Sequence, residues 1–149
     1  MTENPQAQEM NGLRTGNFGE LSIRSEVDIV ATRKAVREVA VGLGFGVTDV
    51  TRIVTAASEL ARNSFLYAGS GLMRWRVLND PSKSAIELIF QDQGPGISDI
   101  QQAMQEGYTS SGGLGMGLPG TKRLMDEMEI SSEPGKGTTV TVRKWHRKL

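Results

Sequence analysis

The sequence predicts an α+β fold in which helices pack on one face of a mixed, mostly antiparallel sheet. Three features predict it: two helix-like stretches early in the chain, two alternating strand-like segments in the middle, and two further strands at the end. A length of 149 residues suits one domain. We expect a mobile arm over residues 1–18, which are mostly polar and aperiodic, and a single domain over residues 19–149.

The domain is expected to begin with one strand and two helices. A short alternating segment predicts a strand over 20–24. Ser25 is a suitable N-cap for a helix over 26–43, which a glycine-rich segment ends. Thr48 is expected to cap a second helix that reaches residue 67, where glycines follow again.

The second half of the chain supplies most of the sheet. Alternating apolar residues predict a hairpin of strands 72–78 and 85–90, and two further strands are expected over 130–132 and 138–145. A short helix is expected over 98–104. Another is expected over 117–128, where Pro119 suits the first turn.

Composition and charge exclude several classes of protein. Lys plus Arg equals Asp plus Glu at 17 each, whereas proteins that bind nucleic acid or membrane surfaces usually carry a basic excess. The absence of cysteine excludes a disulfide scaffold and cysteine-ligated zinc. No apolar run approaches the ~20 residues that span a bilayer, and no signal-peptide pattern is evident. We therefore expect a cytoplasmic protein with neither nucleic-acid nor membrane partners.

Glycine is unusually frequent, at 18 residues, and is densest between Gly94 and Gly120. Glycines before a helix favour phosphate, because bare N–H groups and the helix dipole attract anions. The P-loop pattern fails, since Thr121 precedes the lysine and no Ser or Thr follows it. A Rossmann site fails as well, because no strand precedes the G-x-G-x-x-G spacing that starts at Gly115.

Four short segments occur in a fixed order along the chain. They are ELARN at 59–63, DQGPG at 92–96, GLGMGL at 113–118 and GTT at 137–139. They are expected on a helix, in a loop after a strand, in a loop entering a helix, and at a strand start. This set resembles the N, G1, G2 and G3 boxes of the GHKL ATPase superfamily, which includes gyrase, heat-shock protein 90 and the histidine kinases. The resemblance implies the Bergerat ATP-binding fold, with ATP and Mg²⁺ as cofactors.

A closer resemblance covers residues 25–145. SELARN at 58–63, TSSGGLG at 109–115 and GLPG at 117–120 are similar to the RsbT-type switch kinases of the bacterial stressosome, which are anti-sigma regulatory serine/threonine kinases. The resemblance implies a kinase that phosphorylates a STAS-domain antagonist or scaffold protein and, once released, activates a PP2C-type phosphatase. The alternative is a non-catalytic binding module, either an anti-sigma factor or a switch in which ATP only tunes affinity for a partner.

Candidate site residues follow from these boxes. Glu59 and Asn63, four residues apart on one helix, share a face. The resemblance implies that Glu59 is the general base, that Asn63 ligates Mg²⁺ and that Asp92 accepts a hydrogen bond from adenine. For Asp92, an Asx-turn that starts the glycine loop is the structural alternative. The implied nucleotide-binding residues are Asn63, Asp92, Gly94, Gly96, Ile97, Gly113, Leu114, Gly115, Met116, Gly117 and Thr138.

The partner of the γ-phosphate charge and the role of the basic C-terminal residues each have more than one interpretation. Related kinases carry Glu-Arg shortly before the G2 glycines, where this chain has Gly112 and Gly113, so the charge partner of the γ-phosphate is unassigned. Arg62 is a candidate substitute, although a surface contact is the commoner role for such a residue. Segment 107–113 is the expected lid over ATP. The basic C-terminal residues around Trp145 are interpreted either as a partner contact or as a solvated strand end.

Overall fold

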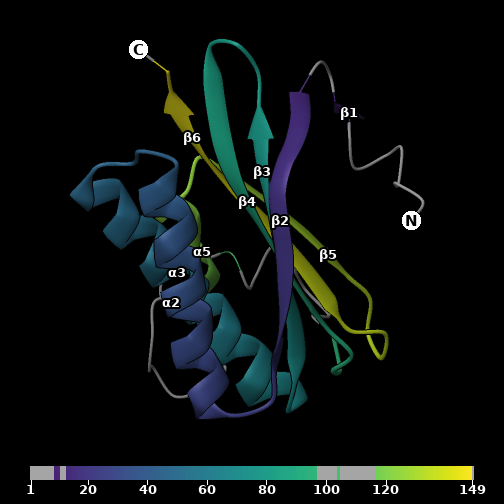
Figure 1. The fold of residues 1–149 in the computed structure, drawn as a ribbon. Helices are drawn as coiled ribbons and strands as arrows, with labels where there is room; N and C mark the ends of the chain where they lie inside the picture. The colour runs from purple at the N-terminus through teal and green to yellow at the C-terminus, as the bar shows by residue number, and fades with distance from the viewer. Residues whose placement is uncertain (1–8, 11–12, 97–103, 105–116, 149) are drawn as a thin grey trace, which may run out of the picture.

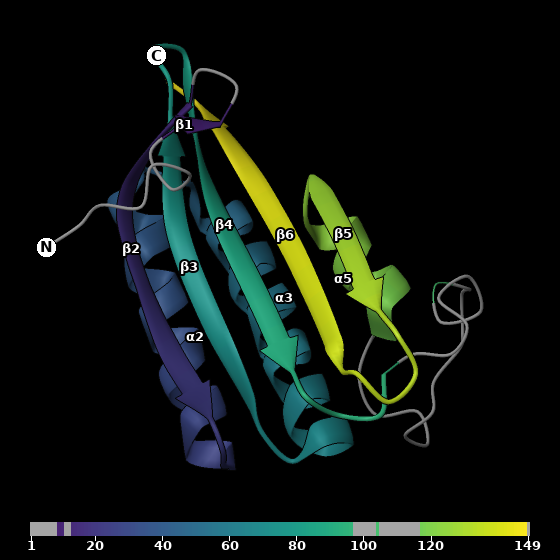
Figure 2. The same ribbon diagram turned by 90° about the vertical axis from the view of Figure 1, so that its right-hand side faces the viewer.

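The computed structural model describes residues 9–10, 13–96, 104 and 117–148. These residues form one antiparallel sheet with helices on one of its faces (Figures 1 and 2). The strand order is β1-β2-β3-β4-β6-β5, and all five pairings are antiparallel. The predicted fold class is confirmed, and the described strands contain no parallel pair.

The elements of the first half are β1 (Glu9–Met10), β2 (Leu13–Ile23), α2 (Glu26–Gly42) and α3 (Val47–Ala68). Those of the second half are β3 (Gly71–Asn79), β4 (Lys83–Asp92), α5 (Gly117–Leu124), β5 (Glu127–Ser132) and β6 (Thr138–Arg147). None of the described helices is both long and apolar enough to cross a bilayer.

Helices α2 and α3 form because their apolar residues recur at helical spacing and are buried against the sheet. Ile29, Val36 and Ala40 make the buried stripe of α2, and Ile53, Ala57 and Leu60 belong to that of α3. Across the interface the helix-facing residues of the sheet complete the core. They include Ile23, Met73, Ile86, Leu88, Phe90, Val140 and Val142.

Several predicted boundaries are wrong. The N-cap of α3 is Gly46 rather than Thr48, and Ser25, which does cap α2, makes no side-chain capping bond. Strand β2 begins at Leu13, and Arg14, Thr15 and Phe18, which we expected in the arm, pair with β3 across a break in register. Helix α5 ends at Leu124 instead of residue 128, because the chain turns there and enters β5. The predicted helix over 98–104 lies outside the described residues except for Met104.

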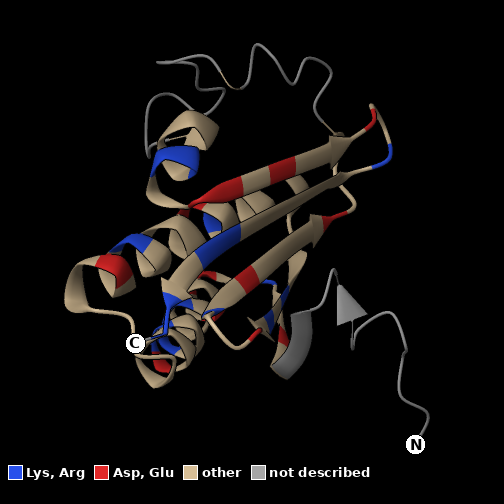
Figure 3. Cartoon of the chain, turned by 90° about the horizontal axis from the view of Figure 1, so that it is seen from above, with Lys and Arg blue, Asp and Glu red and all other residues tan. Residues whose placement is uncertain are grey.

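The face of the sheet away from the helices carries a network of charges. The Glu87 side chain is fully buried in β4, and its carboxylate pairs with Arg76 of β3 and, at 2.6 Å, with Arg143 of β6. Arg143 also bonds Glu127 and Glu129 of β5. Bands of acidic and basic residues accordingly alternate on neighbouring strands in Figure 3. Burial is the largest single influence and lowers the pKa of Arg143, but the hydrogen bond and charge of Glu87, together with the bonds to Glu129 and Glu127, outweigh it, and the net shift is upward.

The basic C-terminal residues therefore belong largely to the fold. Arg143 is held by three carboxylates, and the buried Lys144 donates from Nζ to the carbonyl of Leu124 at 3.1 Å. The Nε1 of Trp145 bonds the Glu127 carboxylate. These contacts contradict the solvated strand end considered for this segment, and the partner contact stays a prediction.

Candidate functional site

Helix α3 carries the two polar residues of the first box. Glu59 lies two turns before the last turn of the helix, and its side chain is only 12% exposed. Its Oε1 accepts a hydrogen bond from Nη1 of Arg62 at 3.0 Å. Asn63 is half-buried one turn later, and its side chain makes no hydrogen bond to another described residue. The helix thus presents a carboxylate and an available amide in consecutive turns.

Asp92 is the last residue of β4, where the strand leaves the sheet. Its Oδ1 accepts the backbone N–H of Gly94 at 2.9 Å, which is the Asx-turn that the sequence offered as the structural alternative. The side chain remains half-buried rather than sealed in the core. Its carboxylate has further acceptor positions, because an ionised carboxylate has about four lone-pair sites. The turn and a contact with a purine amine are therefore compatible.

The last turn of α3 lies directly against the glycine loop after β4. A Cβ added at Gly94 would meet the Cβ of Ala68 at 2.7 Å, so only glycine allows this approach. Figure 2 shows the end of β4, the last turn of α3 and the β5–β6 turn at the same end of the molecule. The helix that carries the first box thus reaches the second box with its last turn, although Glu59 and Asp92 are 33 residues apart in the sequence.

The β5–β6 turn closes the other side of this loop through backbone contacts. Gly96 and Gly137 both have positive φ, and a Cβ on either would overlap a carbonyl oxygen, that of Glu133 or Asp92 respectively. The backbone N–H of Gly135 donates to the carbonyl of Pro95 at 2.7 Å. This interlock supports the segment that carries Asp92. This interlock was not predicted from the sequence, although the glycine spacing of the turn was the available signal.

Thr138 follows this turn and pairs with Asp92 in the β4–β6 register. Its hydroxyl lies 2.9 Å from that of Ser132, which also bonds the carbonyl of Gly137. Thr138 is half-buried, and its hydroxyl is already part of a hydrogen-bonded group at the edge of the site. The structure therefore brings Thr138 and Asp92 together, as the sequence predicts.

The third box is only partly described. Gly117 begins α5 with a φ of 68°, and α5 packs against α3. Ile97, Gly113, Leu114, Gly115 and Met116 lie outside the described residues, as does the expected lid over 107–113. Their nucleotide-binding roles stay predictions.

The described residues fit Mg²⁺ and an adenine nucleotide. Asn63 offers an amide oxygen of the kind that Mg²⁺ accepts, and this ion usually takes its other ligands from phosphates and water. The described part of the chain contains no cluster of three or more acidic or histidine side chains that could hold a metal alone. At the other end, the half-buried Asp92 carboxylate accepts the N–H of Gly94 through Oδ1 and has further acceptor positions for a purine amine.

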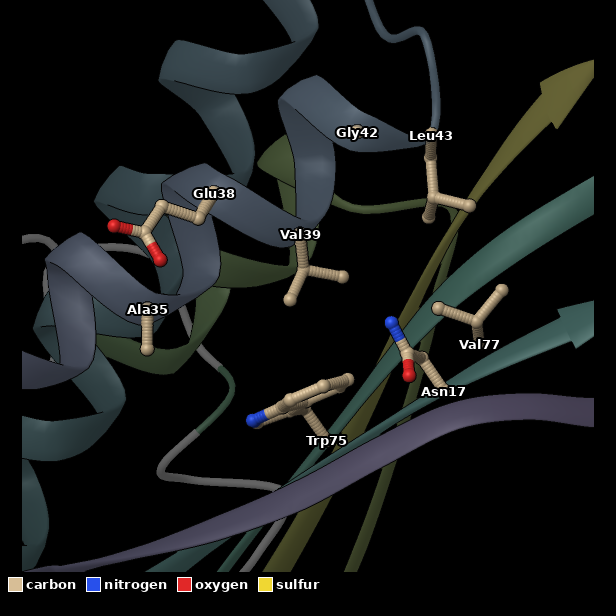
Figure 4. Close-up of a pocket in the computed structure, with 8 residues that line it drawn as sticks. All are labelled: Asn17, Ala35, Glu38, Val39, Gly42, Leu43, Trp75 and Val77. Carbon is tan, nitrogen blue, oxygen red and sulfur yellow. The ribbon is translucent and has the colours of Figure 1, made fainter.

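A separate hollow of about 520 Å³ lies between α2 and the strands β2 and β3 (Figure 4). Its walls are mainly apolar, with Trp75, Val39 and Val77 among them, and Glu38 stands at its margin. Trp75 reaches this position because Gly19 has no Cβ to obstruct the indole. None of the predicted site residues lines this hollow, so it is distinct from the candidate site.

Comparisons with known proteins identify the family of this chain. The family model of the histidine kinase-, DNA gyrase B- and HSP90-like ATPases matches residues 48–148. The serine/threonine-protein kinase RsbT of Bacillus subtilis is 52% identical over 125 residues, which cover 84% of this chain and 94% of that protein. An anti-sigma F factor of Caldanaerobacter subterraneus is 34% identical over 119 residues, which cover 76% and 82% respectively.

Solved structures share the fold at low sequence identity. The RsbU and RsbW domains of Rv1364c from Mycobacterium tuberculosis match with a TM-score of 0.57 at 18% identity. The match covers 87% of this chain and 32% of that longer chain. The mycobacterial sensor histidine kinase MprB matches with a TM-score of 0.52 at 16% identity, over 89% of this chain and all of that one. Together with the family match over more than half of its length, these findings establish that the chain belongs to the histidine kinase-, DNA gyrase B- and HSP90-like ATPase family.

Proposed function

We propose that this protein is a serine/threonine kinase that transfers the γ-phosphate of ATP to a Ser or Thr of a STAS-domain partner. The 52% identity to a serine/threonine-protein kinase over most of both chains supports the activity. The kinase resemblance supports four further points: a STAS-domain acceptor, a PP2C-type phosphatase as second partner, a stressosome-like pathway and a cytoplasmic location. The RsbU domain in a structural neighbour fits such a phosphatase partner.

One observation carries the proposal, namely the order of groups along α3. Its last turn contacts the glycine loop next to Asp92, Asn63 lies about 7.5 Å further back along the axis from Ala68, and Glu59 one turn beyond. An adenine at Asp92 would therefore direct its phosphates toward Asn63, and an acceptor hydroxyl beyond them toward Glu59. That is the order which in-line transfer to a protein hydroxyl requires.

Each residue then has a distinct task. Asp92 fixes the purine, and Gly94 and Gly96 allow the close backbone packing that holds the loop after Asp92. Asn63 would hold Mg²⁺, which supplies charge neutralisation at the phosphates when bound. Glu59 accepts the proton of the acceptor hydroxyl, a contribution typically worth about 10²–10⁴-fold in rate. Gly117, at the start of α5, lies where backbone N–H groups can meet phosphate oxygens.

The test is transfer of label from γ-labelled ATP to a purified STAS protein in the presence of Mg²⁺. We expect Glu59→Gln to abolish labelling while retaining ATP affinity, and Glu38→Gln, an exposed acid on α2, to label like the wild type. Equal labelling by the wild type and Glu59→Gln would refute the role of Glu59 as general base. No labelling by either would refute the kinase proposal. In that case nucleotide-dependent binding of the partner, unaffected by Glu59→Gln, would favour the anti-sigma or switch function that the anti-sigma F factor relatives suggest.

A further inference from the structure

Helix α3 contains two acid–arginine pairs with the same spacing. Asp49 pairs with Arg52 at 3.1 Å, and ten residues later Glu59 pairs with Arg62 at 3.0 Å. In both, the acid precedes the arginine by three residues and one Nη1–carboxylate bond joins them. Pairs of this kind on an exposed helix surface contribute about 0.3–0.5 kcal/mol. Helix stability alone thus gives the two pairs equal roles.

The surroundings of the two pairs differ. The side chains of Asp49 and Arg52 are 37% and 50% exposed, so water competes for both. The Glu59 side chain is 12% exposed, whereas that of Arg62 is 41% exposed. A carboxylate with so little contact with water depends on its protein partners for solvation. The second pair therefore holds a mostly buried acid from the solvent side of the helix.

We infer that Arg62 is a positioning residue for phosphoryl transfer: it holds the Glu59 carboxylate in the orientation that receives the proton of the acceptor hydroxyl. This inference rests on the proposed kinase function. The bond from Nη1 to Oε1 restricts a side chain with three rotatable bonds, and the guanidinium stays charged at every working pH. Arg62 thereby acts on the reaction through Glu59, in place of contact with the γ-phosphate.

The two possible roles of Arg62 separate in the kinetics. A group that orients the base affects the transfer step, so its loss lowers kcat and leaves nucleotide affinity unchanged. A group that binds the γ-phosphate raises the affinity for ATP relative to that for ADP, so its loss weakens ATP binding and leaves ADP binding unchanged. Misplacing a reacting group by about 1 Å can cost roughly 10²-fold.

The experiment measures labelling of the STAS protein, together with calorimetric dissociation constants for Mg-ATP and Mg-ADP, in three variants. We expect Arg62→Gln to lower kcat roughly 10- to 100-fold, with KM for ATP and both dissociation constants within about twofold of the wild type. Arg62→Lys should recover part of the loss, because it restores a cation near Glu59. Arg52→Gln is the matched control and should transfer phosphate like the wild type.

Three results would overturn the inference. The first is an unchanged kcat in Arg62→Gln. The second is a weakening of Mg-ATP binding in Arg62→Gln without a matching change in Mg-ADP binding, which would place Arg62 at the γ-phosphate. The third is an equal loss in Arg52→Gln, which would reduce the pair to helix stabilisation. Failure of the proposed function is distinguishable from all three, because the wild type itself would then transfer no label.

Discussion

A methyl group added at Gly137 should both lower the stability of the fold and weaken nucleotide binding. Gly137 has a φ of 88°, and a Cβ there would fall about 1 Å inside the 3.0 Å limit that real Cβ atoms keep from a neighbouring atom, here the carbonyl oxygen of Asp92. Since both partners are backbone, no rotamer change relieves the overlap. In Gly137→Ala the end of β4 must move, and with it the carboxylate expected to bind adenine.

The magnitude follows from two contributions. An alanine in the left-handed region costs about 1–2 kcal/mol of stability. Loss of a hydrogen bond to a charged group costs about 1.5–3 kcal/mol, which corresponds to roughly 10- to 150-fold in the dissociation constant of ATP. We therefore expect Gly137→Ala to unfold at lower urea concentration and to bind Mg-ATP at least about tenfold more weakly by calorimetry.

Gly135 provides a control within the same turn. Its φ is 78°, but a Cβ there would meet no atom within 4 Å. Gly135→Ala should therefore show the backbone cost of about 1–2 kcal/mol and keep the ATP affinity of the wild type. If both variants bound ATP with the same affinity, the interlock between the β5–β6 turn and Asp92 would play no part in nucleotide binding.

Three further predictions concern single carboxylates. Asp92→Asn should weaken ATP and ADP equally, by about tenfold or more, with little change in stability, because the amide oxygen still accepts the bond of its turn; calorimetry that finds unequal losses would contradict an adenine contact. Glu87→Gln should lower the unfolding free energy by about 3 kcal/mol, since it leaves Arg76 and Arg143 without their buried anion; urea denaturation showing a loss below about 1 kcal/mol would be inconsistent with this. Two backbone N–H groups of its own turn hold the pKa of Asp80 below its ordinary value of 3.8. The Asp80 carboxylate therefore stabilises the folded state at pH values above 3.8, and this contribution is lost as the pH falls through the folded-state pKa. The difference in Tm between wild type and Asp80→Asn should accordingly be present near neutral pH and vanish in strong acid, and a difference independent of pH would exclude this account.

The sequence predicted those parts of the fold that local periodicity controls. Helices α2 and α3 and the β3–β4 hairpin have apolar residues in phase with their own geometry, and each was placed within about three residues of its observed ends. The errors lie where distant pairing decides. Met128 continues the helical pattern of α5 but pairs with Val142 of β6, and that register depends on a strand ten residues further along.

The candidate site shows the same division. The order of Glu59, Asn63 and Asp92 was visible because each belongs to a short local pattern. The fate of Arg143 was not, because its partners lie on β4 and β5 and become neighbours only through strand register. A charge near a chain end therefore predicts little by itself. Its role depends on which acids the sheet brings opposite to it.

The end of the site that is expected to hold adenine is built from backbone rather than from side-chain bonds. Gly94 lies against α3, while Gly96 and Gly137 lie against carbonyl oxygens of neighbouring segments, so three close approaches fix one short loop. A loop held by such contacts loses little conformational entropy when a ligand binds, so less of the favourable binding free energy is offset by ordering. Glu59, by contrast, is a flexible side chain whose orientation depends on ion pairing with Arg62. On the proposed function, affinity for the base depends on this loop and the rate of transfer on how the Glu59 carboxylate is held, so substitutions at the two ends should affect Kd and kcat separately.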